Sequence, residues 1–420
     1  MLSSRTTFGP KLPVELLDHI IDYMQDDRAS LRAMSLVGHV VHNRSRRHLF
    51  HTICIRRDEA GYGDFIQFLQ HNPTLASLVK ELALEGTFPE AHIDTIELRT
   101  KLSSRVIWAI LKLLPHLEIL DISWIIFTSA IGTLLRSGTR PSPISLRKLR
   151  IRNMDIMEGT PHDLHEVDIV ELLQMFSNIG ELTLSMVRPQ CIFLDYQDML
   201  LKLPGYEVDK LLFNLSVQSL VLSPCDSIEN TLLIGLMTRT PSVHTLRSIV
   251  VDLCLGDDLV ALRALLGSTR ALNSLAVHIR SLDAINTNEV IVDLSTLSNL
   301  TNLNITVPIE SAQITKCLAD TMATFLPGPP SREVTIGTYV SMRHTTNQET
   351  HYMFGRMDWS FLDIVFSNTV SLKKVTFDIS QLDLVTTLLD DFSATAPIIN
   401  VLREDLPCTV QRGLLTIITC

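Results

Sequence analysis

The residue types best suited to catalysis are few in this sequence, and the strongest grouping is a pair of histidines. His162 and His165 stand three positions apart, with Asp163 and Glu166 beside them. Zinc sites use such ligands at such spacing, but the segment matches neither HExxH nor HxxEH. It opens a predicted helix, where carboxylates cap the first turn. We therefore expect a helix cap here and no metal site.

Motifs for nucleophilic or phosphate chemistry are absent from the sequence. It contains no GxSxG element, and no predicted strand is followed by GxGxxG or GxxxxGK[ST]. The carboxylate pair Asp257–Asp258 fits a helix cap, and the pair Asp390–Asp391 fits a solvated helix face. We therefore expect neither an enzyme nor a bound cofactor.

The composition is that of a folded, acidic protein. The 420 residues are 46% hydrophobic and 20% charged, with a net charge of −10, which gives no whole-chain attraction to nucleic acid or to an anionic membrane. The seven cysteines include no CxxC pair, and the N-terminus lacks the apolar core of a secretory signal. The longest uncharged apolar stretch, 123–135, is too short to span a bilayer. We expect a cytoplasmic or nuclear protein that binds neither nucleic acid nor membrane.

Three short helices and a strand are predicted in the first sixty residues. Asp26 and Asp27 can cap a second helix that runs through Val41, a third helix covers 45–50, and a strand covers 51–55. The first helix, in 12–24, carries an apolar stripe broad enough to face a core or a partner, formed by Leu12, Leu16, Leu17, Ile20, Ile21 and Met24. A helical unit of this size has a marginal core and usually packs on something else.

The N-terminal segment carries, in order, Leu12-Pro13-x-Glu15-Leu16, Ile20-Ile21, Leu31, Ser35-Leu36-Val37 and Arg46-Arg47-His48-Leu49-Phe50. With these residues it resembles an F-box, in particular those of the large basidiomycete-type F-box families. At the positions where that family usually has Arg and Trp, this sequence has His39 and Val41. The resemblance implies docking onto the Skp-type adaptor of a cullin–RING ubiquitin ligase, through Leu12, Pro13, Leu16, Ile20, Leu36 and Val37.

The rest of the chain repeats a motif of the form apolar-x-x-apolar-x-apolar. Helices are predicted between the copies, at 105–114, 167–176, 228–237, 259–266, 314–325 and 382–392. Its irregular spacing, with Cys225 and Cys254 in the slot after the motif, resembles leucine-rich repeats. The middle apolar residue of each copy, used below as its marker, is Leu82, Leu120, Leu149, Leu182, Leu220, Ile249, Leu275, Leu303, Val334, Val375 or Leu415.

These patterns predict an α/β chain with two parts. A short helical F-box covers 1–60, and a leucine-rich-repeat solenoid covers 61–420, with parallel strands on its concave face and helices on its convex face. A doubly wound α/β enzyme is the alternative, because it also alternates strands with helices. The segments 186–214 and 337–358 interrupt the repeat. The first is expected to carry an added helix, and the second to be either a loop that contacts a partner or a mobile insertion.

Strand side chains that alternate with the buried leucines are the candidates for binding a target. Around Leu149 they are Lys148, Arg150 and Arg152, three cations on one face, which we expect to contact an acidic or phosphorylated protein segment. Equally, they can pair with Asp121 and Glu181 on flanking strands and have no binding role.

The sequence thus predicts the substrate-recognition subunit of a Skp–cullin–F-box ubiquitin ligase. In this reading the N-terminal helices dock the adaptor, the repeats bind an unknown protein substrate, and no side chain of this chain is catalytic. The alternative is a leucine-rich-repeat interaction scaffold without a ligase role. Its N-terminal helices would then serve as a cap for the first repeat.

Overall fold

The structure is a computed structural model of the whole chain that separates into two compact units, residues 1–126 and 127–420. The division predicted at residue 60 falls inside the first unit. The structure describes residues 12–56, 59–86, 100–128, 143–157, 172–189, 214–223, 228–254, 256–280, 291–308, 313–326, 332–339, 354, 357–380 and 395–419.

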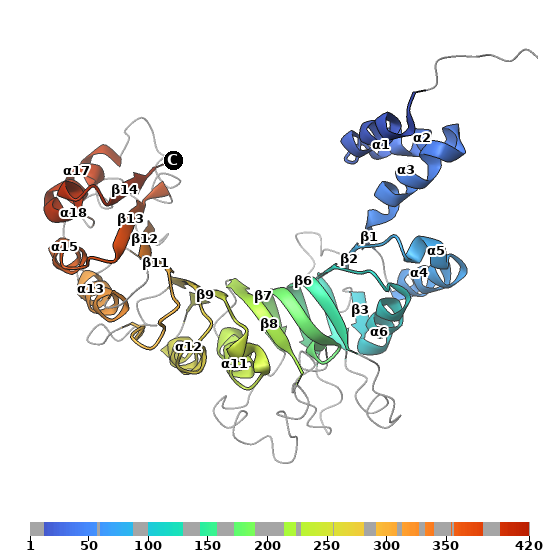
Figure 1. Cartoon of the computed structure of the whole chain (residues 1–420). Helices are drawn as coiled ribbons and strands as arrows, with labels where there is room; N and C mark the ends of the chain where they lie inside the picture. The colour runs from blue at the N-terminus through green and yellow to red at the C-terminus, as the bar shows by residue number, and fades with distance from the viewer. Residues whose placement is uncertain are drawn as a thin grey trace, which may run out of the picture. The chain divides into compact units, whose positions relative to one another are not determined.

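The first unit combines three N-terminal helices with a small parallel sheet (Figure 1). Strands β1, β2 and β4 are paired in parallel, with Ile53 opposite Leu82 and Leu82 opposite Leu120. The elements are α1 (Val14–Tyr23), α2 (Arg28–Val37), α3 (His39–His51), β1 (Thr52–Arg56), α4 (Glu59–His71), α5 (Pro73–Ala76), β2 (Glu81–Glu85), β3 (Thr100–Ser103), α6 (Ser104–Leu113) and β4 (Ile119–Ser123), with β5 (Ile125–Thr128) at the division between the units.

The helix starting at Asp27 is shorter than predicted. The Asp27 carboxylate caps α2 as expected, accepting hydrogen bonds from the backbone N–H groups of Ala29 and Ser30, both at 3.1 Å. The helix ends at Val37, however, because Gly38 takes an extended conformation and its carbonyl accepts the N–H of His42 at 3.0 Å. The prediction of one helix through Val41 was therefore wrong, and Val41 belongs to α3.

A close backbone contact fixes the end of β2. The N–H of Gly86 donates to the carbonyl of Ser123 at 2.9 Å, and a Cβ at Gly86 would lie 1.9 Å from the carbonyl oxygen of Trp124. Trp124 itself has φ of 58°, a conformation that bulky residues rarely adopt. Only glycine fits at position 86 without displacing this turn.

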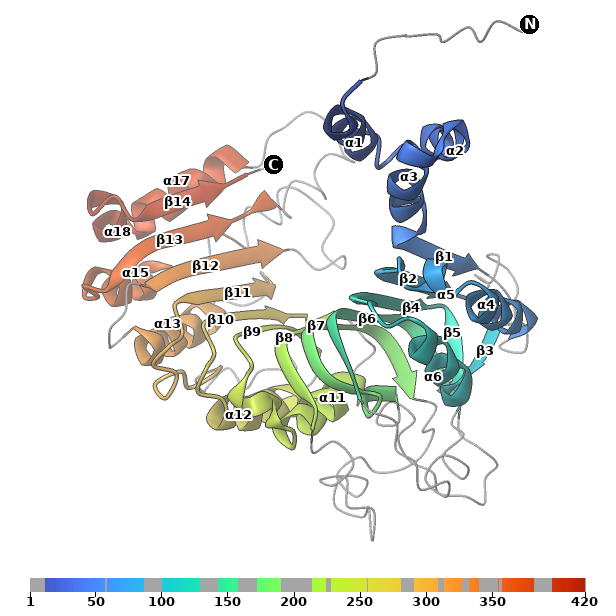
Figure 2. The same ribbon diagram turned by 45° about the vertical axis from the view of Figure 1, so that its right-hand side comes forward.

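The second unit is a larger parallel sheet whose strands follow the order of the chain from β6 to β14 (Figure 2). Its elements are β6 (Ile144–Met157), β7 (Phe176–Pro189), β8 (Ser216–Ser223), α11 (Ile228–Thr238), the 3₁₀ helix η2 (Pro241–His244), β9 (Ser248–Leu253), α12 (Gly256–Ser268), β10 (Ser274–Ile279), β11 (Asn302–Pro308), α13 (Gln313–Phe325), β12 (Arg332–Tyr339), α15 (Ser360–Ser367), β13 (Leu372–Asp378), α17 (Thr395–Asp405), α18 (Pro407–Gln411) and β14 (Leu415–Ile418).

The predicted motif copies are strands, and their markers stand opposite one another. In the second unit each marker is the register partner of the next, from Leu149 through Leu182, Leu220, Ile249, Leu275, Leu303, Val334 and Val375 to Leu415. All of them except Leu415 are buried. The α/β class with parallel strands is thereby confirmed.

The two faces of this sheet differ sharply. Helices α11, α12, α13 and α15 lie on one side, where they cover the marker residues (Figure 2). Along β10 and along 219–223 of β8 buried residues alternate with half-buried ones, because successive strand side chains point to opposite faces. We call the side opposite these four helices the open face; in β10 it carries Ser274, Ala276 and His278.

Some predicted elements differ from the structure or lie outside its description. Of the helix predicted over 167–176, the described residues Leu172 and Leu173 are helical, but the helix ends before 176, because β7 begins at Phe176. The histidine pair at 162 and 165, most of 186–214 and most of 337–358 fall outside the described residues. The predicted helices at 228–237, 259–266 and 314–325 are confirmed as α11, α12 and α13.

Replacing Gly86 with alanine tests the close contact at the end of β2. We expect Gly86→Ala to lower the free energy of unfolding by about 2–3 kcal/mol, because the new methyl group meets backbone that cannot rotate away. Urea unfolding of the full chain, followed by circular dichroism, measures the change.

Gly63, inside α4, is the matched control, since no atom lies within 4 Å of the position its Cβ would take. Gly63→Ala should raise stability by roughly 0.5–1 kcal/mol, as expected for a helix interior. Equal unfolding midpoints for the two variants would contradict the contact.

Candidate functional site

The broad apolar stripe of α1 is divided between an inner and an outer face. Ile21 is fully buried and Leu17 packs beside it, whereas Leu16 and Ile20 are 50% and 42% exposed. The inner face contributes to a small core that contains Ile21, Leu31 and Val41, with Leu17, Met34 and Leu49 packed against it. The stripe therefore faces both a core and the solvent.

Apolar side chains are exposed on all three N-terminal helices. Leu36 and Val37, at the end of α2, are 86% and 81% exposed, and Leu12 and Pro13 precede α1 in exposed positions. All six residues predicted to bind the adaptor are thus accessible. With Val14, Tyr23 and Val40 they make up what we call the apolar N-terminal surface. It holds more than half of the large apolar side chains that are exposed in the described residues.

A charged clamp holds α1 against α3 beneath this surface. The Asp22 carboxylate accepts hydrogen bonds from Arg44, at 2.7 Å from Nε and 2.5 Å from Nη2, and from His48 Nε2 at 2.7 Å. The hydrogen bond from Arg44, followed by that from His48, holds the pKa of Asp22 well below its usual range. The clamp fixes which side of α1 faces outward.

Val41 lies in the small core and not on the apolar N-terminal surface. It is 8% exposed and packs with Ile21 and Leu31. A tryptophan at this position would overfill that core unless the helices moved apart. The small side chain at position 41 is thus tied to the packing of these helices.

The three cations predicted to bind an acidic target are not equivalent in the structure. Lys148 forms an ion pair with Glu181 on β7, as the alternative prediction of pairing with flanking strands expected. Arg150 is half-buried and Arg152 exposed, and both also have interaction partners. The described structure therefore offers no row of three uncompensated charges along β6.

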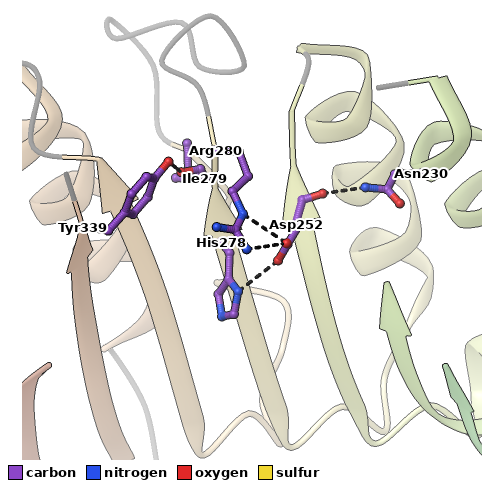
Figure 3. Close-up of polar contacts among 6 residues, drawn as sticks. All are labelled: Asn230, Asp252, His278, Ile279, Arg280 and Tyr339. Carbon is purple, nitrogen blue, oxygen red and sulfur yellow. Dashed lines mark hydrogen bonds and ion pairs between the residues drawn. The ribbon is translucent and has the colours of Figure 1, made fainter. Parts of the chain in front are cut away.

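A polar cluster on the open face was not predicted from the sequence. Asp252, near the end of β9, pairs with His278 of β10 and with Arg280, which directly follows β10. Tyr339 of β12 lies beside Arg280 (Figure 3). We call these four residues the Asp252 cluster. Aligning the repeats on their markers gives the signal that could have found it, since Asp252 and His278 each follow the third apolar residue of the motif and are register partners.

Two other classes of site find no support in the described residues. No group of three or more His, Cys, Asp or Glu side chains there could hold a metal ion. No helix in the described part of the chain is long and apolar enough to cross a bilayer.

The sequence matches no family model and no curated protein. The accessibility and chemistry of the side chains are therefore the grounds on which a function can be inferred. The apolar N-terminal surface points most directly to a partner, because a folded chain rarely leaves a group of large apolar side chains exposed without one.

Removing the charge at position 22 tests the clamp. We expect Asp22→Asn to speed amide hydrogen exchange in α1 and α3 by about two- to fivefold, equivalent to roughly 0.5–1 kcal/mol for a partly exposed ion pair. Because folding lowers the pKa of Asp22, the clamp's contribution is complete above the ordinary aspartate range and is lost as the pH falls through the lowered value.

Asp64→Asn is the control, since it removes the same charge from an exposed position on α4. It should leave exchange in α1 and α3 unchanged at every pH. Exchange rates in α1 that are identical in wild type and Asp22→Asn at pH 7 would show that the clamp has no stabilising effect.

Proposed function

We propose that this chain is the substrate-recognition subunit of a Skp–cullin–F-box type ubiquitin ligase. The observation that carries the proposal is the outward-facing half of the α1 stripe, Leu16 and Ile20, on a helical unit whose own core is small. Docking onto the adaptor removes this apolar area from water. Burying a leucine or isoleucine side chain contributes roughly 1.5–3 kcal/mol.

The exposure pattern favours docking over the capping alternative. A helix that caps a repeat array hides its apolar face against that array. Leu16, Ile20 and Leu36 instead remain exposed, while the α3 helix leads directly into β1. The apolar N-terminal surface is therefore available to a separate protein.

The repeats are proposed to form a leucine-rich-repeat solenoid that holds the target. Support comes from the register of the markers, the sequential strand order and the helices on one side of the sheet. A doubly wound enzyme covers both faces of its sheet with helices. Here the four helices α11, α12, α13 and α15 lie on one side, and the open face carries polar residues such as Ser219, Asn304 and Thr306, which suits protein binding.

The contribution of such a subunit to catalysis is proximity. Holding the target and the adaptor on one chain makes ubiquitin transfer effectively intramolecular, which lowers the entropic part of its barrier. In this mechanism the chemistry belongs to other subunits, and the chain supplies no nucleophile, base or metal. Its requirements are two binding surfaces and a linkage between them.

Charged substitutions on the outer face of α1 test the adaptor interaction. We expect Leu16→Asp combined with Ile20→Asp to weaken binding of a purified Skp-type adaptor by about a hundredfold or more, since both side chains would lie in the centre of the interface. Isothermal titration calorimetry with the full chain measures the affinity, and circular dichroism checks that both helices and strands remain.

Val260→Asp, at a 62% exposed position on α12, is the matched control and should bind the adaptor like wild type. Leu36→Asp gives an independent test from α2. If wild type binds no adaptor, or if the double variant binds as tightly as wild type, the proposed function is wrong.

A further inference from the structure

The centre of the Asp252 cluster is a buried carboxylate with three charge-assisted hydrogen bonds. His278 Nδ1 lies 2.9 Å from Oδ1 of Asp252, and Arg280 reaches Oδ2 with Nε at 3.1 Å and Nη2 at 2.8 Å. The Asp252 side chain is only 3% exposed. Its backbone carbonyl accepts a further hydrogen bond from Asn230 Nδ2 at 2.7 Å (Figure 3). A buried carboxylate with these partners holds both neighbours in fixed orientations.

The carboxylate also determines the tautomer of His278. A carboxylate only accepts hydrogen bonds, so the proton of the neutral imidazole must be on Nδ1. Nε2 then keeps its lone pair and is an acceptor. His278 is 30% exposed, and no described residue hydrogen-bonds to its Nε2.

Arg280 is held from two sides. Its guanidinium lies 5.9 Å from the centre of the Tyr339 ring, and the Tyr339 hydroxyl donates to the carbonyl of Ile279 at 2.7 Å. Nε and Nη2 are used by Asp252, while Nη1 has no hydrogen-bond partner among the described residues. The side chain is 41% exposed. It therefore presents a fixed donor at little further entropic cost.

The cluster thus offers one donor and one acceptor, side by side and without net charge. The negative charge of Asp252 and the positive charge of Arg280 cancel, and a neutral His278 adds no charge. The side chains of His278 and Arg280 lie on the same face of β10. Each has one edge toward Asp252 and the other edge away from it (Figure 3). An anion would gain no net Coulomb attraction here and would face the lone pair of His278 Nε2.

We propose that His278 and Arg280 bind a primary carboxamide, the side chain of an asparagine or glutamine in the bound protein segment. The carboxamide oxygen accepts from Arg280 Nη1, and its NH₂ donates to His278 Nε2. This deepens the proposed function, on which it rests, by naming the chemistry that the open face recognises.

The geometry of amides favours a side chain over the peptide backbone. In a trans peptide bond the N–H and C=O point in opposite directions, so one peptide unit cannot address both nitrogens from one side. A primary carboxamide carries both groups on the same edge. The side chains beside His278 on the open face, Ala276 and Thr306, are likewise uncharged.

The test uses the full chain with ¹⁵N-labelled histidine and arginine at pH 7.5. Nitrogen spectra first give the tautomer of His278, which must be the Nδ1–H form. Four probes are then titrated: propionamide, the equally shaped propionate, inorganic phosphate and N-methylacetamide. We expect a saturable shift of His278 Nε2 with propionamide alone, with His244, an exposed histidine on η2, as the internal control.

Arg280→Lys keeps the charge but removes the planar fork. It should weaken propionamide binding about tenfold, as expected for loss of one hydrogen bond from a charged donor. A saturable shift with N-methylacetamide as large as that with propionamide would overturn the assignment to a side chain. An Nε2–H tautomer or an imidazolium at pH 7.5, a response to propionate or phosphate, or no response to any probe would overturn the site itself.

Adaptor titration of the same labelled sample separates this inference from the proposed function. A chain that binds the adaptor but not propionamide refutes the carboxamide site alone. A chain that binds propionamide but not the adaptor supports the site and refutes the ligase role.

Discussion

The in-register stacking of apolar strand residues is the constraint from which the other features of the second unit follow. Each marker residue faces the markers of the neighbouring strands, and nearly all are removed from water. A shift of one residue in any strand would turn its apolar side chains to the open face. Because the register is fixed in this way, the strand residues next to each marker are held on the open face.

The polar and charged side chains of the sheet accordingly lie on the open face, and several of the charged ones form ion pairs with neighbouring strands. Lys148 is paired with Glu181, and Arg280 with Asp252. Between them the strands present serine, threonine and asparagine side chains such as Ser219, Thr183 and Asn304. Such a surface suits recognition by directed hydrogen bonds more than by charge. The N-terminal helices differ, since their small core leaves apolar side chains in the solvent.

Much of the fold was predictable from the sequence because its signal is local. The apolar spacing around Leu220 or Leu275 identifies a strand without knowledge of its neighbours, and the Asp27 cap follows from a few adjacent residues. The end of α2 was missed because an isolated glycine is often tolerated inside a helix. The Asp252 cluster was missed for another reason. Its members lie up to 87 positions apart, from Asp252 to Tyr339, and only the pairing of strands brings them together. Similarly, the division of the α1 stripe depends on how α3 packs against it.

The central claim is that the apolar N-terminal surface is covered by a Skp-type adaptor. Amide hydrogen exchange of the full chain, with and without a saturating amount of purified adaptor, tests it most directly. The account predicts slower exchange in α1 and at the end of α2, with β8 to β11 unchanged. Unchanged exchange in both helices, or protection confined to the strands of the second unit, would contradict it.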